Sequence, residues 1–248
     1  MQKIIDKLTL NIFDTRQLAG RAAGQAAATA LKKTLAEKGK ARMIFAAAPS
    51  QDECLETLIA EPGIDWSKVT AFHMDEYIGL DADAPQRFCR YLQDHIFGLL
   101  PFDKIHLLEG ADPEILCMKY TELLIAAPID IVCMGIGENG HIAFNDPPVA
   151  DFDDPKLVKI VELDLACRQQ QVNDGCFATL DEVPKQAITL TIPALMRGEC
   201  LICTVPGNRK HYAVHAAMEH DISTLCPASI LRTHKNCQMF VDRDCWGQ

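Results

Sequence analysis

A glycine-rich segment that ends in a histidine follows an apolar run near the middle of the chain. Residues 135–141 read Gly-Ile-Gly-Glu-Asn-Gly-His, and residues 129–134 before them are almost entirely apolar. Glycines allow a backbone to approach a small ligand closely. Imidazole is a side chain that can act as both acid and base near neutral pH, and Asn139 and Asp146 lie close enough in sequence to orient the ring of His141. We therefore expect acid–base chemistry at this loop.

The same segment also matches the Gly-x-Gly-x-x-Gly pattern of dinucleotide-binding folds. In those folds a helix begins at the glycines, and its N-terminus binds the pyrophosphate. Here Pro147 and Pro148 stop any helix within two turns. The segment is also far from the N-terminal strand and helix that usually carry this pattern. We expect a loop that binds a small ligand and no dinucleotide.

A second polar cluster, Phe-His-Met-Asp-Glu-Tyr at 72–77, follows another apolar run. By itself it is most simply a solvated acidic turn. In an extended segment Asp75 and Glu76 point in opposite directions, so the two carboxylates cannot form an acid–base pair. We expect one of them to enter a pocket and the other to be held by a structural partner.

A third cluster, Val-Pro-Gly-Asn-Arg-Lys at 205–210, indicates a strand that turns at a glycine into a helix. Backbone amides at a helix start, with a cation such as Lys210 beside them, suit a phosphate group. An ordinary basic turn would have the same sequence, so this cluster alone leaves both interpretations open.

The chain has 11 cysteines, an odd number, and most lie in apolar runs. Cys200 and Cys203 form a Cys-x-x-Cys pair, but the sequence around them is typical of a buried strand. There is no second pair to complete a zinc site. We expect reduced thiols, core packing for this pair and no metal.

Composition excludes several classes of function. The formal net charge of −10 argues against nonspecific nucleic-acid binding, which needs clustered Lys and Arg. Charged residues at the N-terminus do not fit a signal peptide, and no apolar run is long enough to cross a bilayer. We expect a cytoplasmic protein without a membrane or nucleic-acid partner.

Helical and strand patterns alternate along the chain. Helices are predicted at 15–38 (capped by Asp14), 53–59, 85–99, 113–125, 164–177 and 207–219. Strands are predicted at 42–48, 69–73, 104–108, 129–134, 157–161, 187–191, 201–205 and 238–241. This alternation predicts an α/β fold, Rossmann-like, with a mostly parallel doubly wound sheet and helices on both faces, as one domain over 1–248. Ligands bind beyond the carboxyl ends of such strands, where the three clusters lie.

Together these segments resemble the glucosamine-6-phosphate deaminase/isomerase family. The most specific matches are Phe-His-Met-Asp-Glu-Tyr-Ile-Gly-Leu at 72–80 and Gly-Ile-Gly-Glu-Asn-Gly-His-Ile-Ala-Phe-Asn-Asp-Pro at 135–147. Weaker matches at 183–189, 207–210 and 226–234 follow in the family's order. The 6-phosphogluconolactonases share the fold and a related Gly-His loop, but Met-Asp-Glu-Tyr fits the deaminases better.

The resemblance implies ring opening of a phosphorylated amino sugar, then aldose–ketose isomerisation with loss of ammonia, without metal or organic cofactor. It implies that His141 opens the ring and that Asp75 moves a proton between C2 and C1. Asp146 would orient His141, and Asn139 would assist it. Substrate-binding positions carried over from the family are Pro49, Ser50, Gly137, Gly140 and Lys210. The substrate would be glucosamine-6-phosphate or galactosamine-6-phosphate, and a homo-oligomer is compatible with the family.

The chain departs from the family pattern at several positions. Many members have Asp at the position of Asn139 and Glu at the position of Asp146. The first phosphate loop, 48–51, lacks the usual Gly and Thr. Cys176 stands where the family often has a phosphate-binding arginine, and the candidates to compensate are Arg168 and Arg209.

Two other functions remain open at this point. A sugar-phosphate lactonase or simple isomerase would retain His141 but release no ammonia. A non-catalytic sugar-phosphate sensor would need neither Asp75 nor His141, so their presence together favours an enzyme.

Overall fold

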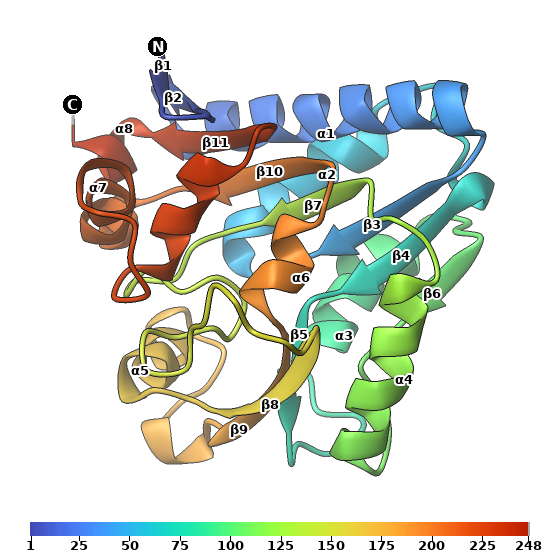
Figure 1. The fold of residues 1–248 in the computed structure, drawn as a ribbon, viewed down its shortest axis with the longest axis vertical. Helices are drawn as coiled ribbons and strands as arrows, with labels where there is room; N and C mark the ends of the chain where they lie inside the picture. Colours follow the sequence, from blue (N-terminus) through green and yellow to red (C-terminus); the bar gives the residue numbers. More distant parts are fainter. Residues whose placement is uncertain (248) are drawn as a thin grey trace.

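A computed structural model describes residues 1–247 and has an eight-stranded sheet at its centre (Figure 1). In spatial order its strands are β1 (Gln2–Ile5), β2 (Leu8–Phe13), β11 (Cys237–Asp242), β10 (Cys200–Val205), β7 (Ile131–Met134), β3 (Ala41–Phe45), β4 (Val69–His73) and β6 (Lys104–His106). Only β1 is antiparallel to its neighbour; the other six pairings are parallel. The predicted mostly parallel sheet is therefore confirmed.

Helices cover both faces of this sheet, as predicted (Figure 1). Their bounds are α1 (Arg16–Lys38), α2 (Asp52–Ala60), α3 (Phe88–Leu92), α4 (Pro113–Ile125), α5 (Leu165–Asn173), α6 (Ile192–Met196), α7 (His211–Glu219) and α8 (Arg243–Trp246). Side chains of α1, α2 and α3 belong to one apolar cluster, and those of α4, α6 and α7 belong to the other. Both faces of the parallel strands are buried in this arrangement.

The Cys-x-x-Cys pair lies on β10, whose six residues are all buried. Cys200 belongs to the apolar cluster on one face of the sheet and Cys203 to the cluster on the other. Side chains three apart on a strand point to opposite faces, so the two sulfurs cannot meet. Both thiols are free, and the expectation of core packing is confirmed.

The long first helix begins one residue later than predicted. Its N-cap is Thr15, whose Oγ accepts a hydrogen bond from the Leu18 amide at 3.3 Å. The prediction that Asp14 caps this helix was wrong, since that carboxylate instead pairs with Arg243 at 2.9 Å. The consequence is that Arg16 occupies the first helical position.

Strands β5 (Asp75–Ile78), β9 (Gln186–Leu190) and β8 (Val158–Glu162) form a second, antiparallel sheet in that order. The strands predicted at 157–161 and 187–191 are present, but they belong to this small sheet and extend away from the parallel one (Figure 1). Strand β5 was missed, because its acidic sequence was interpreted as a turn. It carries Asp75 directly after the end of β4.

None of the helices within residues 1–247 combines the length and the apolar character that crossing a bilayer requires.

Candidate active site

A pocket of about 340 Å³ opens at the carboxyl ends of β3, β4, β7 and β10. The residues that line it come from the three polar clusters at 72–77, 135–141 and 205–210 and from the 48–51 loop, among others. Six of the nine predicted site residues are among them: Pro49, Ser50, Asp75, Gly137, His141 and Lys210. The parallel sheet thus gathers side chains that are up to 161 positions apart in sequence, from 49 to 210.

His141 lines the pocket, and two oxygen atoms contact Nδ1 of its ring. Its Nδ1 lies 2.8 Å from Asn139 Oδ1 and 2.9 Å from Asp146 Oδ1. Both neighbours are acceptors in this geometry, because Asn139 Nδ2 donates to Asp146 Oδ1 at 2.9 Å. Nδ1 therefore carries the proton, and Nε2 has no hydrogen-bond partner within residues 1–247. Asn139 and Asp146 support the ring without lining the pocket.

Asp146 is fully buried behind His141, and it remains ionised there. Burial by itself would raise the pKa of Asp146. The charge and hydrogen bond of His141 oppose this effect, helped by the Asn139 amide and the Cys167 thiol, and the resulting pKa is below the ordinary value. Burial and the Asp146 charge raise the pKa of Cys167 well above its usual range, so its sulfur is a neutral thiol. Cys167, Asp146 and His141 lie within 4.8 Å of one another.

Gly137 allows His141 to take this place. A Cβ atom at position 137 would lie 2.1 Å from Cε1 of the His141 ring, a distance that no side chain can occupy. The Gly137 amide also donates to the His141 carbonyl at 2.9 Å, which closes the loop on itself. No helix begins at these glycines, in agreement with the expectation against a dinucleotide-binding turn.

Gly140 is not among the residues that line the pocket, and its assignment as a substrate-binding residue stays a prediction. Its φ of 83° is in the left-handed region that favours glycine. Its carbonyl accepts from the Ala228 amide at 2.8 Å, and a Cβ would approach Cys226. The residue therefore shapes the loop.

Asp75 and Glu76 separate as the sequence predicted. Asp75 lines the pocket, and burial, with a further contribution from the Glu76 charge, raises its pKa well above the usual range. The Glu76 carboxylate points the other way and accepts from the amides of Phe88 at 3.1 Å and Cys89 at 2.9 Å. Those amides are at the start of α3, so Glu76 holds that helix in place.

Ser50, Lys210 and Arg209 are the lining residues that could contact an anion. The Ser50 hydroxyl accepts from Gln51 Nε2 at 3.3 Å, and its own proton is therefore free to donate to a ligand. Lys210 is mostly buried, and this burial lowers its pKa. Arg209 is engaged by two carboxylates, at 2.6 Å by Asp174 and at 3.4 Å by Glu138.

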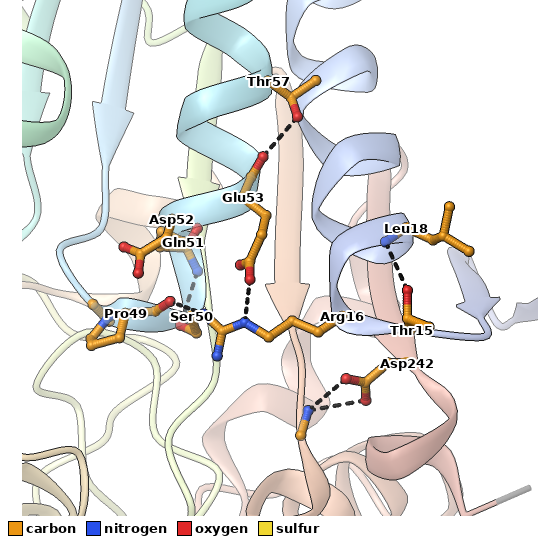
Figure 2. Close-up of polar contacts among 12 residues, drawn as sticks. Thr15, Arg16, Leu18, Pro49, Ser50, Gln51, Asp52, Glu53, Thr57 and Asp242 are labelled. Atoms are coloured by element: carbon orange, nitrogen blue, oxygen red, sulfur yellow. Dashed lines mark hydrogen bonds and ion pairs between the residues drawn. The ribbon is translucent and has the colours of Figure 1, made fainter.

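The Gly207 amide is not available to a phosphate. It donates to both oxygens of the buried Asp242, at 3.0 and 3.1 Å (Figure 2). The predicted turn from strand to helix is present at this position, but the aspartate occupies its first amide.

Several lining residues were not identified from the sequence: Arg16, Gln51, Gln170, Gln171 and Asp174. Their only sequence signal is polarity, which they share with many surface residues. Arg168, one of the two candidates to compensate for the missing arginine, is not in the pocket, because its Nη2 donates to the Leu180 and Val183 carbonyls at 2.6 and 2.9 Å.

A second compartment of about 280 Å³ adjoins the pocket and shares Ala48 and Gln171 with it. Cys176 lines this second compartment. Burial and the nearby Asp174 raise the pKa of the Cys176 thiol, so the position carries no charge near neutral pH. The place in which the resemblance predicts an arginine therefore provides no cation.

The chain is similar to curated glucosamine-6-phosphate deaminases. The chain is 31% identical over 221 residues to the glucosamine-6-phosphate deaminase of Streptococcus pyogenes serotype M1, covering 88% of this chain and 92% of the relative. It is 34% identical over 183 residues to that of Bacillus cereus (strain B4264), covering 73% and 68%.

Solved structures agree. A monomeric glucosamine-6-phosphate deaminase superposes with a TM-score of 0.87 at 26% identity, covering 96% of this chain and 98% of that one. A 6-phosphogluconolactonase from Shewanella baltica superposes with a TM-score of 0.76 at 19% identity, covering 97% and 99%, which shows a shared fold.

The family described as glucosamine-6-phosphate isomerases/6-phosphogluconolactonase matches residues 14–240. This match spans nearly the whole chain, including every residue that lines the pocket. The chain belongs to this family.

Proposed function

We propose that this protein is an amino-sugar-phosphate isomerase/deaminase, which converts glucosamine-6-phosphate or galactosamine-6-phosphate to the ketose-6-phosphate and ammonia. The observation that carries this proposal is that Asp75 and His141 line one pocket, in which Asp75 is buried and Asp146 holds the ring of His141. A buried carboxyl group and an oriented imidazole are the two acid–base groups that such a reaction needs. The deaminase relatives, similar over most of the chain, support the same assignment.

The first step is ring opening, and it is assigned to His141. Nε2 takes the proton of the anomeric hydroxyl and returns a proton to the ring oxygen as the C1–O5 bond breaks. The products are an aldehyde at C1 and a free hydroxyl at C5. Asp146 and Asn139, both at Nδ1, keep the ring in the tautomer that leaves Nε2 free to accept.

The second step is proton transfer between two carbons, and it is assigned to Asp75. The carboxylate takes the proton from C2, and an ammonium proton moves to O1, which gives the enolamine. Asp75 then returns its proton to C1 and leaves an iminium at C2. Water adds to C2, and ammonium departs as the ketone forms. The balance is one substrate and one water for one ketose-6-phosphate and one ammonium.

The burial of Asp75 suits this role. A carboxylate with an ordinary pKa would hold the C2 proton too weakly to remove it from carbon. Its raised pKa makes Asp75 a stronger base and an acid that can still protonate C1. Each placed acid or base contributes about 10²–10⁴-fold to the rate.

The test is an assay of ammonia and ketose-6-phosphate released from glucosamine-6-phosphate and galactosamine-6-phosphate side by side. Equal amounts of both products from either sugar would support the proposal, and the preferred sugar identifies the C4 epimer. Ketose without ammonia would indicate a simple isomerase. Neither product from folded protein, together with hydrolysis of a sugar-phosphate lactone, would replace the proposal with a lactonase.

The variant Asp75→Asn, measured in the same assay, tests the role of Asp75. The amide has nearly the same size as the carboxyl group and cannot accept a proton, so turnover should fall by at least about 10²-fold while ligand binding is retained. Asp81→Asn is the matched control, because Asp81 is exposed and lies six positions further along the chain. Undiminished turnover in Asp75→Asn would remove Asp75 from the mechanism.

A further inference from the structure

Position 176, where the family resemblance predicts an arginine, provides no cation to the pocket. Cys176 is neutral, and two carboxylates, those of Asp174 and Glu138, offset the charge of Arg209. Lys210 is available, but its burial disfavours the charged form. A phosphate dianion bound here needs a further group that is charged at all working pH values and has donors to spare.

Arg16 is such a group. It lines the pocket from the first position of α1, far from the other site residues in sequence. Its Nε donates to Glu53 Oε1 at 2.5 Å, and its Nη2 donates to the Pro49 carbonyl (Figure 2). Its Nη1 has no hydrogen-bond partner within residues 1–247. One edge of the guanidinium is thus fixed, and the other is free to bind a ligand.

The edge of Arg16 formed by Nε and Nη2 is fixed by the close packing of two helices. Helices α1 and α2 pack so closely that a Cβ at Gly20 would lie 2.4 Å from Glu53 Cβ, and one at Gly24 would lie 2.5 Å from the Cys54 carbonyl oxygen. This contact places Glu53 opposite Arg16. The hydrogen bond that Arg16 donates to Glu53 raises the pKa of Arg16 although partial burial opposes the effect, and the charge is therefore permanent. An arginine held in this way loses little conformational entropy when an anion binds.

The neighbours of Arg16 complete an anion site. Pro49, whose carbonyl it binds, precedes Ser50, and the Ser50 hydroxyl has a proton to donate. The turn that carries Lys210 lies on the other side, close enough that Asp242, which holds the Gly207 amide, also raises the pKa of Arg16. Figure 2 shows the guanidinium between the 49–51 loop and Asp242.

We propose that Arg16, together with Ser50 and Lys210, binds the phosphate group of the substrate, with Glu53 positioning the guanidinium. This inference rests on the proposed function for the identity of the substrate, and on the pocket alone for the binding of a phosphate. It also explains how the site retains an arginine although position 176 is a cysteine: the guanidinium comes from α1.

The experiment compares Arg16→Gln with Arg21→Gln. Arg21 is on the same helix and exposed, so its replacement makes the same change in net charge away from the pocket. Steady-state kinetics with the amino-sugar phosphates measure KM and kcat. Titration calorimetry with inorganic phosphate measures anion affinity without any turnover.

We expect Arg16→Gln to raise both KM and the Kd for inorganic phosphate by about 10- to 100-fold, as loss of a hydrogen-bonded charge should. Its kcat should stay within a few-fold of the wild type, and Arg21→Gln should match the wild type throughout. Equal phosphate affinity in the two variants would overturn the proposal. A fall in kcat with KM and phosphate affinity unchanged would also overturn it.

Arg16→Lys guards against misfolding of the glutamine variant. Lysine keeps the charge but loses the fork that contacts Glu53 and the ligand together, so the Kd for phosphate should lie between those of the wild type and Arg16→Gln. Wild-type affinity in Arg16→Lys would show that charge alone suffices, and would overturn the assigned geometry. If the wild type binds phosphate through Arg16 but deaminates neither sugar, the proposed function fails and the phosphate site stands.

Discussion

Nδ1 of His141 lies 2.9 Å from Oδ1 of Asp146, and the carboxylate that makes this contact is completely buried. The ring is therefore oriented by a charge that solvent does not screen. The second oxygen of Asp146 has no hydrogen-bond partner within residues 1–247. The fixed negative charge thus acts mainly on His141 and its partner Asn139.

Asp146→Asn tests this orientation. An amide keeps the shape but loses the charge, and the ring is free to adopt the tautomer with its proton on Nε2, which cannot accept one from the sugar. We expect kcat to fall by about 10²–10⁴-fold with KM nearly unchanged. Steady-state kinetics with Asp151→Asn as an exposed control measure the effect. An activity above one third of the wild-type value would mean that Asn139 alone orients the ring.

Asp75→Asn should make the protein more stable at neutral pH. The folded-state pKa of Asp75 is raised above its unfolded value of about 3.9. Between these two pKa values the folded state binds more protons than the unfolded state, so the protein loses stability as pH rises through this range. An elevation by one pKa unit corresponds to about 1.4 kcal/mol, or about 3 °C in Tm for a chain of this size.

Thermal melts from pH 4 to 8 provide the measurement. The gain in Tm over the wild type should be largest at neutral pH and should shrink towards pH 4, where the folded-state carboxyl is protonated and about half of the unfolded-state carboxyls are protonated too. Asp81→Asn should give no such trend, because that side chain is exposed. A gain that does not depend on pH would contradict the buried-charge explanation.

Gly137→Ala should inactivate the protein by displacing His141. The new Cβ would lie 2.1 Å from Cε1 of the imidazole, so the ring or the loop has to move. We expect kcat/KM to fall by about 10²-fold or more, with a loss of about 1–3 kcal/mol in the free energy of unfolding.

Gly110→Ala is the control, since its Cβ would meet no atom closer than 3.9 Å. Kinetics and urea unfolding of both variants separate the effect on the site from the effect on the fold. Wild-type kcat/KM in Gly137→Ala would show that the loop adapts and that the close packing has no catalytic consequence.

His73 should contribute to acid sensitivity. Burial lowers its pKa to about 3, with a smaller contribution from Arg87, and its Nε2 accepts a hydrogen bond from the Leu108 amide at 2.6 Å. The unfolded value is about 6.5, so the folded state binds fewer protons between these two values and loses stability as pH falls through this window.

His73→Gln keeps an acceptor for the Leu108 amide but does not titrate. Urea unfolding at pH 7 and pH 4.5 should show a smaller loss of stability in the variant than in the wild type, whatever its stability at pH 7. A loss at least as large as that of the wild type would indicate that other groups dominate the acid response.

The sequence was sufficient to predict those parts of the site that follow local rules. Asp75 and His141 come directly after apolar strands, and parallel strands end at one edge of a sheet, so their convergence could be expected. The separation of Asp75 from Glu76 followed from strand alternation. These inferences need only the order of the elements and the period of a strand.

Arg16 could not be found in this way. Its place depends on how closely α1 and α2 pack, which is decided by Gly20 and Gly24 against a helix more than 25 positions away. The small sheet was missed for a similar reason, because antiparallel pairing of β5 with β9 joins residues more than 100 positions apart. Strand β2 did leave a signal: residues 8–12 read Leu-Thr-Leu-Asn-Ile, in which apolar and polar side chains alternate.

The register between β5 and β9 has a consequence for how this sequence can evolve. Asp75 is opposite Thr189, and this pairing determines which of the two adjacent acids faces the sugar. Deleting or inserting one codon between 74 and 78 would exchange the two faces, placing Glu76 towards the pocket and removing the cap of α3. Natural length variation should therefore be tolerated in the 79–86 loop and be absent from the four residues of this strand.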